Sequence, residues 1–188
     1  MPQRRMKTLT LALVVSVFLT PLGAAPAEPA SRAVTLARAM RSDELAVSGA
    51  KRAFASRAVP EYANANLGCV KRVDYQDFTA KFARVIEQVL NAPEIETAIA
   101  FYQSSAGTKY VEGTIRRLRD SFGDDTGLPK IAGVEDISPA EREAISTFAS
   151  SDLGRKIAGK KMTESPAALQ FGREMIDEIG QKCSKSRK

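Results

Sequence analysis

Two serine–lysine pairs are the residues of this chain whose type and spacing can support chemistry. Both occur in the pattern F-x-x-S-x-x-G-x-K, and each residue of the second copy lies 47 positions after its counterpart in the first. The two copies consist of Phe101, Ser104, Gly107 and Lys109, and of Phe148, Ser151, Gly154 and Lys156. A serine hydroxyl activated by a lysine amine is a nucleophile for hydrolysis. The same groups can instead bind a carboxylate or phosphate.

A third interpretation is architectural, because a repeated unit commonly stacks against its own copy. Apolar residues precede each phenylalanine at helical spacing, so we expect both rings to face the core. The serine permits a close helix contact, and the glycine either ends the helix in a left-handed cap or admits a second backbone. The lysine favours the negative end of the helix dipole. We therefore expect a helix–Gly–helix corner in two related units, at about residues 94–113 and 141–160.

Paired glutamates stand upstream of each motif, at Glu94 and Glu96 and again at Glu141 and Glu143. Two carboxylates can act as the acid and base of a glycoside hydrolase. Acidic residues in the first turn of a helix, however, are sufficiently explained by the helix dipole. We therefore interpret these glutamates as helix starts.

Two further patterns are interpreted as incidental. Ser48 and Lys51 match the S-x-x-K pattern of penicillin-recognising enzymes, but the S-D-N and K-T-G elements are missing. Asp120, Asp124 and Asp125 lie near glycines but lack the alternating ligands and distal glutamate of a calcium-binding EF-hand. We interpret that segment as a polar loop.

The composition excludes several classes of active site. The chain contains no histidine, which removes His-based triads and the commonest zinc ligand. No glycine-rich loop that binds phosphate precedes a helix. The sequence therefore assigns no catalytic residue, no cofactor and no metal ligand.

The first 27 residues have the layout of a secretory signal peptide. Basic residues in 1–7 precede the apolar run Thr8–Leu22, and Ala25-Pro26-Ala27 forms an A-x-A site with cleavage expected after Ala27. The apolar run is shorter than a membrane-spanning helix requires. We expect an exported protein, periplasmic or secreted, that has no transmembrane anchor after cleavage.

The predicted cleavage removes much of the basicity. The formal net charge is +6, and three of these charges belong to Arg4, Arg5 and Lys7. Short basic runs remain at 116–119 and in the tail 184–188, where a solvated helix face and a chain terminus are the expected explanations. Because the chain has no tryptophan and no nucleic-acid-binding signature, we expect no nucleic-acid partner.

The chain has two cysteines, Cys69 and Cys183. Export to an oxidising compartment favours a disulfide between them, closing a long loop. A redox role would require a C-x-x-C motif or a nearby resolving cysteine, and the sequence has neither. The predicted bridge is structural.

Helical periodicity extends through almost the whole chain, and the expected class is an all-α, single-domain helical bundle. We divide it into N-terminal helices with an irregular linker (28–73), a helical core (74–183) and the basic tail. The predicted buried stripes are Phe78, Phe82, Val85, Ile86, Val89 and Leu90; Val111, Ile115, Leu118 and Phe122; and Leu169, Gly172, Ile176, Ile179 and Cys183.

An exported helical chain with F-x-x-S-x-x-G-x-K after a Pro- and Glu-led helix start resembles the bacterial DUF2059 family. The residues that carry the resemblance lie chiefly in Ser138–Met162, with a looser echo in Glu94–Val111. The resemblance implies an exported helical domain. It implies no activity and no catalytic residues.

Two functional hypotheses follow. In the first, the chain is a non-catalytic binding module of the cell envelope whose repeated corners form a groove for an envelope protein, a peptide or a lipid. This hypothesis predicts an exposed apolar groove beside the helices of Phe101 and Phe148. In the second, the chain is a small periplasmic hydrolase that uses a Ser–Lys pair of the repeat. The sequence specifies neither the partner nor the oligomeric state.

Overall fold

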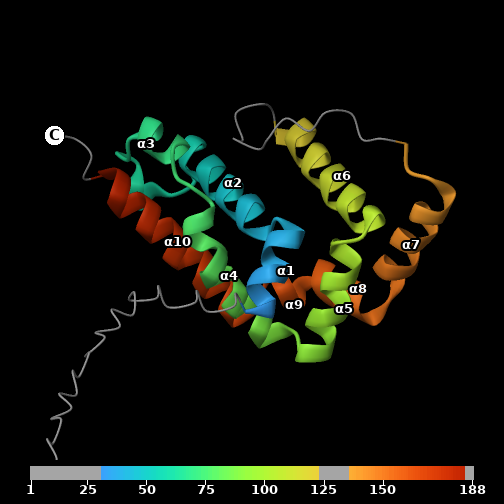
Figure 1. The fold of residues 1–188 in the computed structure, drawn as a ribbon. Coiled ribbons are helices and arrows are strands. Elements are labelled where there is room, and N and C mark those ends of the chain that lie inside the picture. The colour runs from blue at the N-terminus through green and yellow to red at the C-terminus, as the bar shows by residue number, and fades with distance from the viewer. Residues whose placement is uncertain (1–30, 123–135, 185–188) are drawn as a thin grey trace, which may run out of the picture.

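The computed structural model describes residues 31–122 and 136–184, and Figure 1 shows that this part of the chain is built from helices. The predicted all-α class is confirmed, since the described residues form no strand. In chain order the elements are α1 (Arg32–Met40), α2 (Ser42–Ala55), the 3-10 turn η1 (Pro60–Tyr62), α3 (Leu67–Lys71), α4 (Gln76–Val89), α5 (Ala92–Tyr102), α6 (Ser105–Phe122), α7 (Pro139–Ser150), α8 (Asp152–Ala158), α9 (Lys160–Thr163) and α10 (Pro166–Ser184).

The starts of α5 and α7 show why the chain becomes helical where it does. Both have a complete capping box, in which Asn91 or Ser138 accepts from the N3 backbone and the N3 glutamate accepts from the cap backbone. Each helix also has a proline in its first two positions, where a missing N–H costs no hydrogen bond. Both helix starts were predicted from the sequence.

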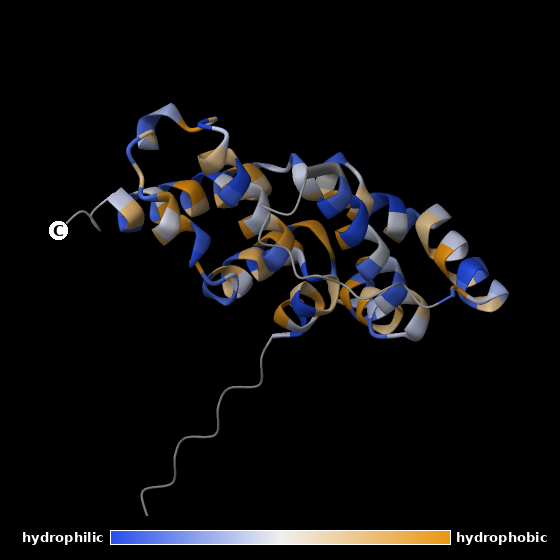
Figure 2. Ribbon diagram, turned by 90° about the horizontal axis from the view of Figure 1, so that it is seen from above, coloured by the Kyte–Doolittle hydropathy of each residue, from blue (hydrophilic) through white to orange (hydrophobic). Residues whose placement is uncertain are grey.

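Helix α4 lies at the centre of the core and packs against α1, α2, α9 and α10. Its buried side includes Phe78, Val85 and Ile86, as the periodicity predicted. Leu36 from α1, Val47 from α2 and Ile179 from α10 are also almost fully buried. Figure 2 shows that single helices carry both hydrophobic and hydrophilic residues, which is typical of helices that bury one side.

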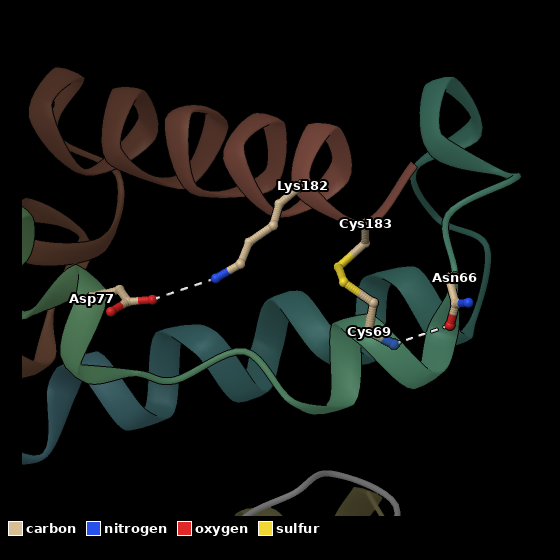
Figure 3. Close-up of a disulfide and its surroundings, with 5 residues drawn as sticks. All are labelled: Asn66, Cys69, Asp77, Lys182 and Cys183. Atoms are coloured by element: carbon tan, nitrogen blue, oxygen red, sulfur yellow. Dashed lines mark hydrogen bonds and ion pairs between the residues drawn. A yellow bond between two sulfur atoms is a disulfide. The ribbon is translucent and has the colours of Figure 1, made fainter. Parts of the chain in front are cut away.

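A disulfide joins α3 to the end of α10, as Figure 3 shows. The Cα atoms of Cys69 and Cys183 are 5.5 Å apart, so the predicted pairing is confirmed. Asn66 caps α3 by accepting from the Cys69 backbone N–H, with a donor–acceptor distance of 3.0 Å. The irregular linker predicted within residues 28–73 is therefore wrong in part, because the short helix α3 forms beside the bridge.

The predicted stripe of α10 is wrong at its first residue. The buried side of this helix contains Phe171, Met175, Ile179 and Cys183, which follow one another at intervals of four. Leu169 lies off this side and is 53% exposed. The periodicity identified the helix correctly but misplaced the edge of its apolar side.

Several predictions concern residues outside the described ranges. They include the signal peptide, the loop with Asp124 and Asp125, and the end of the basic tail. In the part of the chain that the structure describes, no helix combines the length and apolarity needed to cross a membrane.

Candidate functional site

The two motifs form the same corner. In the first, the Ser104 hydroxyl donates to the Phe101 carbonyl (2.7 Å) and accepts from the Gly107 N–H (3.1 Å). In the second, Ser151 makes the equivalent bonds with Phe148 (2.6 Å) and Gly154 (2.9 Å). Each serine thus closes the end of one helix and caps the start of the next, a role that differs from the predicted close helix contact.

The glycines allow the corner to be tight. A Cβ added to Gly107 would lie 2.0 Å from the Phe101 carbonyl oxygen, and one added to Gly154 would lie 2.0 Å from that of Phe148. No side chain fits at such a distance. Of the two predicted roles for glycine, the structure therefore shows the close approach of a second backbone.

The two phenylalanines stack on each other. Their ring centroids are 3.7 Å apart and their planes differ by 5°. Tyr102 meets Phe148 edge-on with centroids 5.5 Å apart, and burial raises the pKa of its hydroxyl. The side chains of Phe101 and Phe148 are half-buried against the core. The rings thus face inward, as expected, but their main contact is with each other.

The lysines pair across the two units. Lys109 of the first unit donates to Glu141 of the second, with Nζ 2.8 Å from Oε2. Lys156 of the second donates to both carboxylate oxygens of Glu94 in the first, at 2.9 and 2.7 Å. The predicted interaction with the end of the lysine's own helix is replaced by these two reciprocal ion pairs.

These contacts indicate a two-fold relationship between the units. Phe101 of the first unit contacts the equivalent residue of the second, Phe148. The lysine of each unit pairs with the glutamate of the other. That reciprocity characterises an isologous interface, usually seen between two identical subunits. Here it occurs within one chain.

Glu141 accepts hydrogen bonds from three groups. It accepts from the Lys109 ammonium (2.8 Å), the Ser105 hydroxyl (2.6 Å) and the Ser138 backbone N–H (2.8 Å). The bond from Lys109, followed by those from Ser105 and Ser138, lowers the pKa of Glu141 to about 2. The carboxylate therefore stays ionised and serves two structural purposes, a helix cap and an ion pair.

This geometry argues against a Ser–Lys nucleophile. Both serine hydroxyls already direct their hydrogen at a backbone carbonyl. Both lysine ammonium groups donate to carboxylates, and a charged ammonium cannot act as the base that activates serine. Three of the four glutamates are engaged as well, since Glu94 and Glu141 accept from the lysines and Glu96 pairs with Arg32 of α1. These contacts hold each corner and join the two units.

An exposed groove lies beside the stacked rings, with a volume of about 580 Å³. The side chains that line it come from α5, α7 and the start of α8: Thr97, Ala140, Glu143, Ala144, Thr147, Phe148, Ser151 and Leu153. Helix α7, at one edge of the molecule in Figure 1, buries none of its residues completely. Phe148, Ser151 and Glu143 of this set were named from the sequence, Glu143 only as part of a helix start. Ala140, Ala144 and Thr147 were not, although they recur at helical spacing.

Metal binding receives no support from the described ranges, 31–122 and 136–184. Within them, no group of three or more acidic or cysteine side chains is placed to hold an ion.

Ser48 and Lys51, the S-x-x-K match, lie one turn apart on α2, where burial lowers the pKa of Lys51. Asp74 opposes that shift.

The comparison with known families supports the resemblance. Residues 76–121 match a family model described as "Uncharacterized protein conserved in bacteria (DUF2059)". The predicted DUF2059 resemblance is confirmed. The matched DUF2059 region covers α4, α5 and nearly all of α6, and so contains the first unit, whereas we expected the resemblance chiefly in Ser138–Met162. The curated proteins and the solved structures contain no match to the chain.

Proposed function

We propose that this protein is a non-catalytic binding module of the cell envelope and that the groove between α5 and α7 is its binding site. The observation that supports this role is the position of the groove. It lies directly beside the paired corners, whose polar groups are used in holding the two units together. The groove beside these groups is open to a binding partner, and the ring of Phe148 lines it.

The groove suits an apolar peptide segment that carries a basic residue. Ala140, Ala144 and Leu153 supply methyl groups, and Phe148 supplies a ring face. Glu143 supplies an exposed carboxylate that would attract a lysine or arginine of the peptide. A volume of about 580 Å³ is in the range of sites that hold small ligands or a few side chains.

Two observations support a location outside the cytoplasm. The Cys69–Cys183 disulfide is of the kind that persists in oxidising compartments. The N-terminal segment has the three-part layout of an export signal, with predicted cleavage after Ala27. Together they favour the periplasm of a bacterial cell, in keeping with the bacterial family that the chain resembles.

The test is a selection of random peptides displayed on phage against residues 28–188, which include every core residue given above. We expect enrichment of apolar sequences that contain lysine or arginine. Ala144→Gln, which places a polar side chain in the groove, should weaken the selected peptides at least about tenfold. Ser146→Gln makes a similar change at an exposed position of α7 outside the groove and should leave binding unchanged.

The peptide selection decides whether the groove between α5 and α7 is a binding site. If no peptide is enriched, or if the enriched peptides bind Ala144→Gln as tightly as the wild type, the groove is not the binding site and the proposal fails. Enrichment of acidic rather than basic sequences would contradict the role given to Glu143.

A further inference from the structure

A second groove, separate from the paired corners, runs between α2 and α10 with a volume of about 650 Å³. Small residues form much of its surface: Ala46, Gly49 and Ala53 on α2, and Ala168 and Gly172 on α10. Such residues let another backbone approach closely. Small side chains alone do not identify a binding partner. Three other features of the groove indicate what it binds.

The first feature is the two glycines. Gly49 and Gly172 lie inside helices, where glycine is less stable than alanine. A Cβ at either position would meet nothing within 4 Å, so packing within the chain does not require glycine there. In contrast to Gly107 and Gly154, these glycines leave an open depression on the surface.

The second feature is Leu169, which lines the same groove and is 53% exposed, the most exposed of the large hydrophobic side chains in the described residues. A single exposed leucine is common on protein surfaces. Here, however, the projecting side chain stands beside depressions at Gly49 and Gly172. One surface therefore carries both a projection and a space for it.

The third feature is the charge at the edge of the groove. Arg173 on α10 and Glu61 on η1 both line it, and both are exposed. Neither takes part in an ion pair within the described residues. Asp177 also lines the groove, but its carboxylate accepts a hydrogen bond from the Tyr62 hydroxyl of the same chain (2.9 Å). Arg173 and Glu61 are therefore the pair of opposite charges that this surface can offer to a partner.

From these features we propose that the α2–α10 groove is the interface with a second copy of this chain. A two-fold axis makes an interface isologous, so each residue that projects from one copy meets the complementary position of the other. Leu169 of each copy enters the depression at Gly49 and Gly172 of its partner, and Arg173 of each faces Glu61 of the other. The surface supplies both halves of each contact, in shape and in charge, and no foreign partner is required.

Sedimentation velocity of residues 28–188 over a range of concentrations tests this interface. We expect the wild type to form a dimer that dissociates on dilution. Gly49→Gln places a side chain in the depression, and its Cβ meets nothing within 4 Å. The variant should therefore fold normally and raise the dimer Kd at least about tenfold. Gly113→Gln is the matched control, because Gly113 is also inside a helix with nothing within 4 Å of an added Cβ.

A charge exchange tests the pairing of the two copies. Arg173→Glu alone and Glu61→Arg alone should each raise the Kd about two- to fivefold, the size expected of an exposed ion pair. Mixing the two single variants should restore association, because both charge contacts of the heterodimer then join opposite charges, whereas each variant alone places like charges together.

Three outcomes would overturn the proposal. A wild type that stays monomeric at every concentration would assign the groove to another occupant, such as a peptide. A dimer that Gly49→Gln leaves intact would place the interface elsewhere on the molecule. A dimer that Gly113→Gln weakens as much as Gly49→Gln would show that the effect does not come from this groove.

Discussion

Phe101 and Phe148, which occupy the same position of the two repeat units, lie face to face with their ring centroids 3.7 Å apart. Their contact joins two corners that are further connected by the reciprocal ion pairs Lys109–Glu141 and Lys156–Glu94. The repeated motif is thus the internal interface of the protein. Its phenylalanines and lysines make the contacts between the two units. Its serines and glycines form the tight corner within each unit.

The first prediction concerns the close approach at the corner. Gly107→Ala forces a Cβ to within 2.0 Å of the Phe101 carbonyl oxygen, and we expect the free energy of unfolding to fall by about 3 kcal/mol. Gly113→Ala, in the same helix, meets nothing and should raise it by about 0.5–1 kcal/mol. Urea denaturation measures both. Equal effects of the two substitutions would show that the corner is not tight.

The second prediction concerns the reciprocal ion pairs. Lys156→Met removes the partner of Glu94 in a pair whose side chains are 25% and 26% exposed, and should lower the free energy of unfolding by about 1 kcal/mol. Lys160 and Glu164 form an exposed pair with N and O atoms 3.8 Å apart. Lys160→Met should therefore change stability by less than about 0.5 kcal/mol. If it costs as much as Lys156→Met, the cross-unit pair has no special role.

The third prediction is a dependence on pH. Because the pKa of Glu141 is about 2 in the folded protein and near 4.5 ordinarily, its ionised form stabilises the fold above about pH 4.5. This stabilisation is lost as the pH falls from about 4.5 through 2. Wild type should therefore lose stability relative to Glu141→Gln over this range, as measured by urea denaturation at several pH values.

Lys109→Gln provides the matched test of cause. It removes the largest contribution to the lowered pKa of Glu141, so the difference between this variant and Lys109→Gln/Glu141→Gln should depend less on pH. If the difference in free energy of unfolding between wild type and Glu141→Gln stays constant down to about pH 2, the pKa of Glu141 is not lowered as described.

The fourth prediction concerns the disulfide, which links residues 114 positions apart. Replacing both Cys69 and Cys183 by alanine should lower the free energy of unfolding by about 4 kcal/mol, chiefly because the unfolded chain regains its freedom. A thermal melt with and without dithiothreitol gives a second reading, in which wild type loses stability and the double variant does not change. A wild type unaffected by reduction would contradict the stabilising role.

Local sequence signals predicted much of this fold. The helix starts after Asn91 and Ser138 follow from a proline and a glutamate in the first turn, and the buried side of α4 follows from its period. The pairing of Cys69 with Cys183 needed only the count of cysteines and the expected compartment. The helix starts and the buried side of α4 depend on residues close together in the chain. The disulfide could be predicted because two cysteines allow one pairing.

The features that were missed depend on contacts between distant segments. The motif marked Lys109 and Lys156, but a lysine's partner is set by how two corners pack, and no spacing in the chain encodes it. Leu169 was misplaced for the same reason, because the packing of α10 against α4, α3 and α2 decides which of its sides is buried. The groove of α7 was expected in outline, but its lining was not.

A double-mutant cycle on Phe101→Leu and Phe148→Leu tests the pairing of the two units most directly. Each leucine keeps an apolar side chain in place but removes the stacked pair. Urea denaturation of the wild type, both single variants and the double variant should give a coupling free energy of about 1 kcal/mol. A coupling near zero would show that the two rings act independently and would contradict the internal two-fold interface.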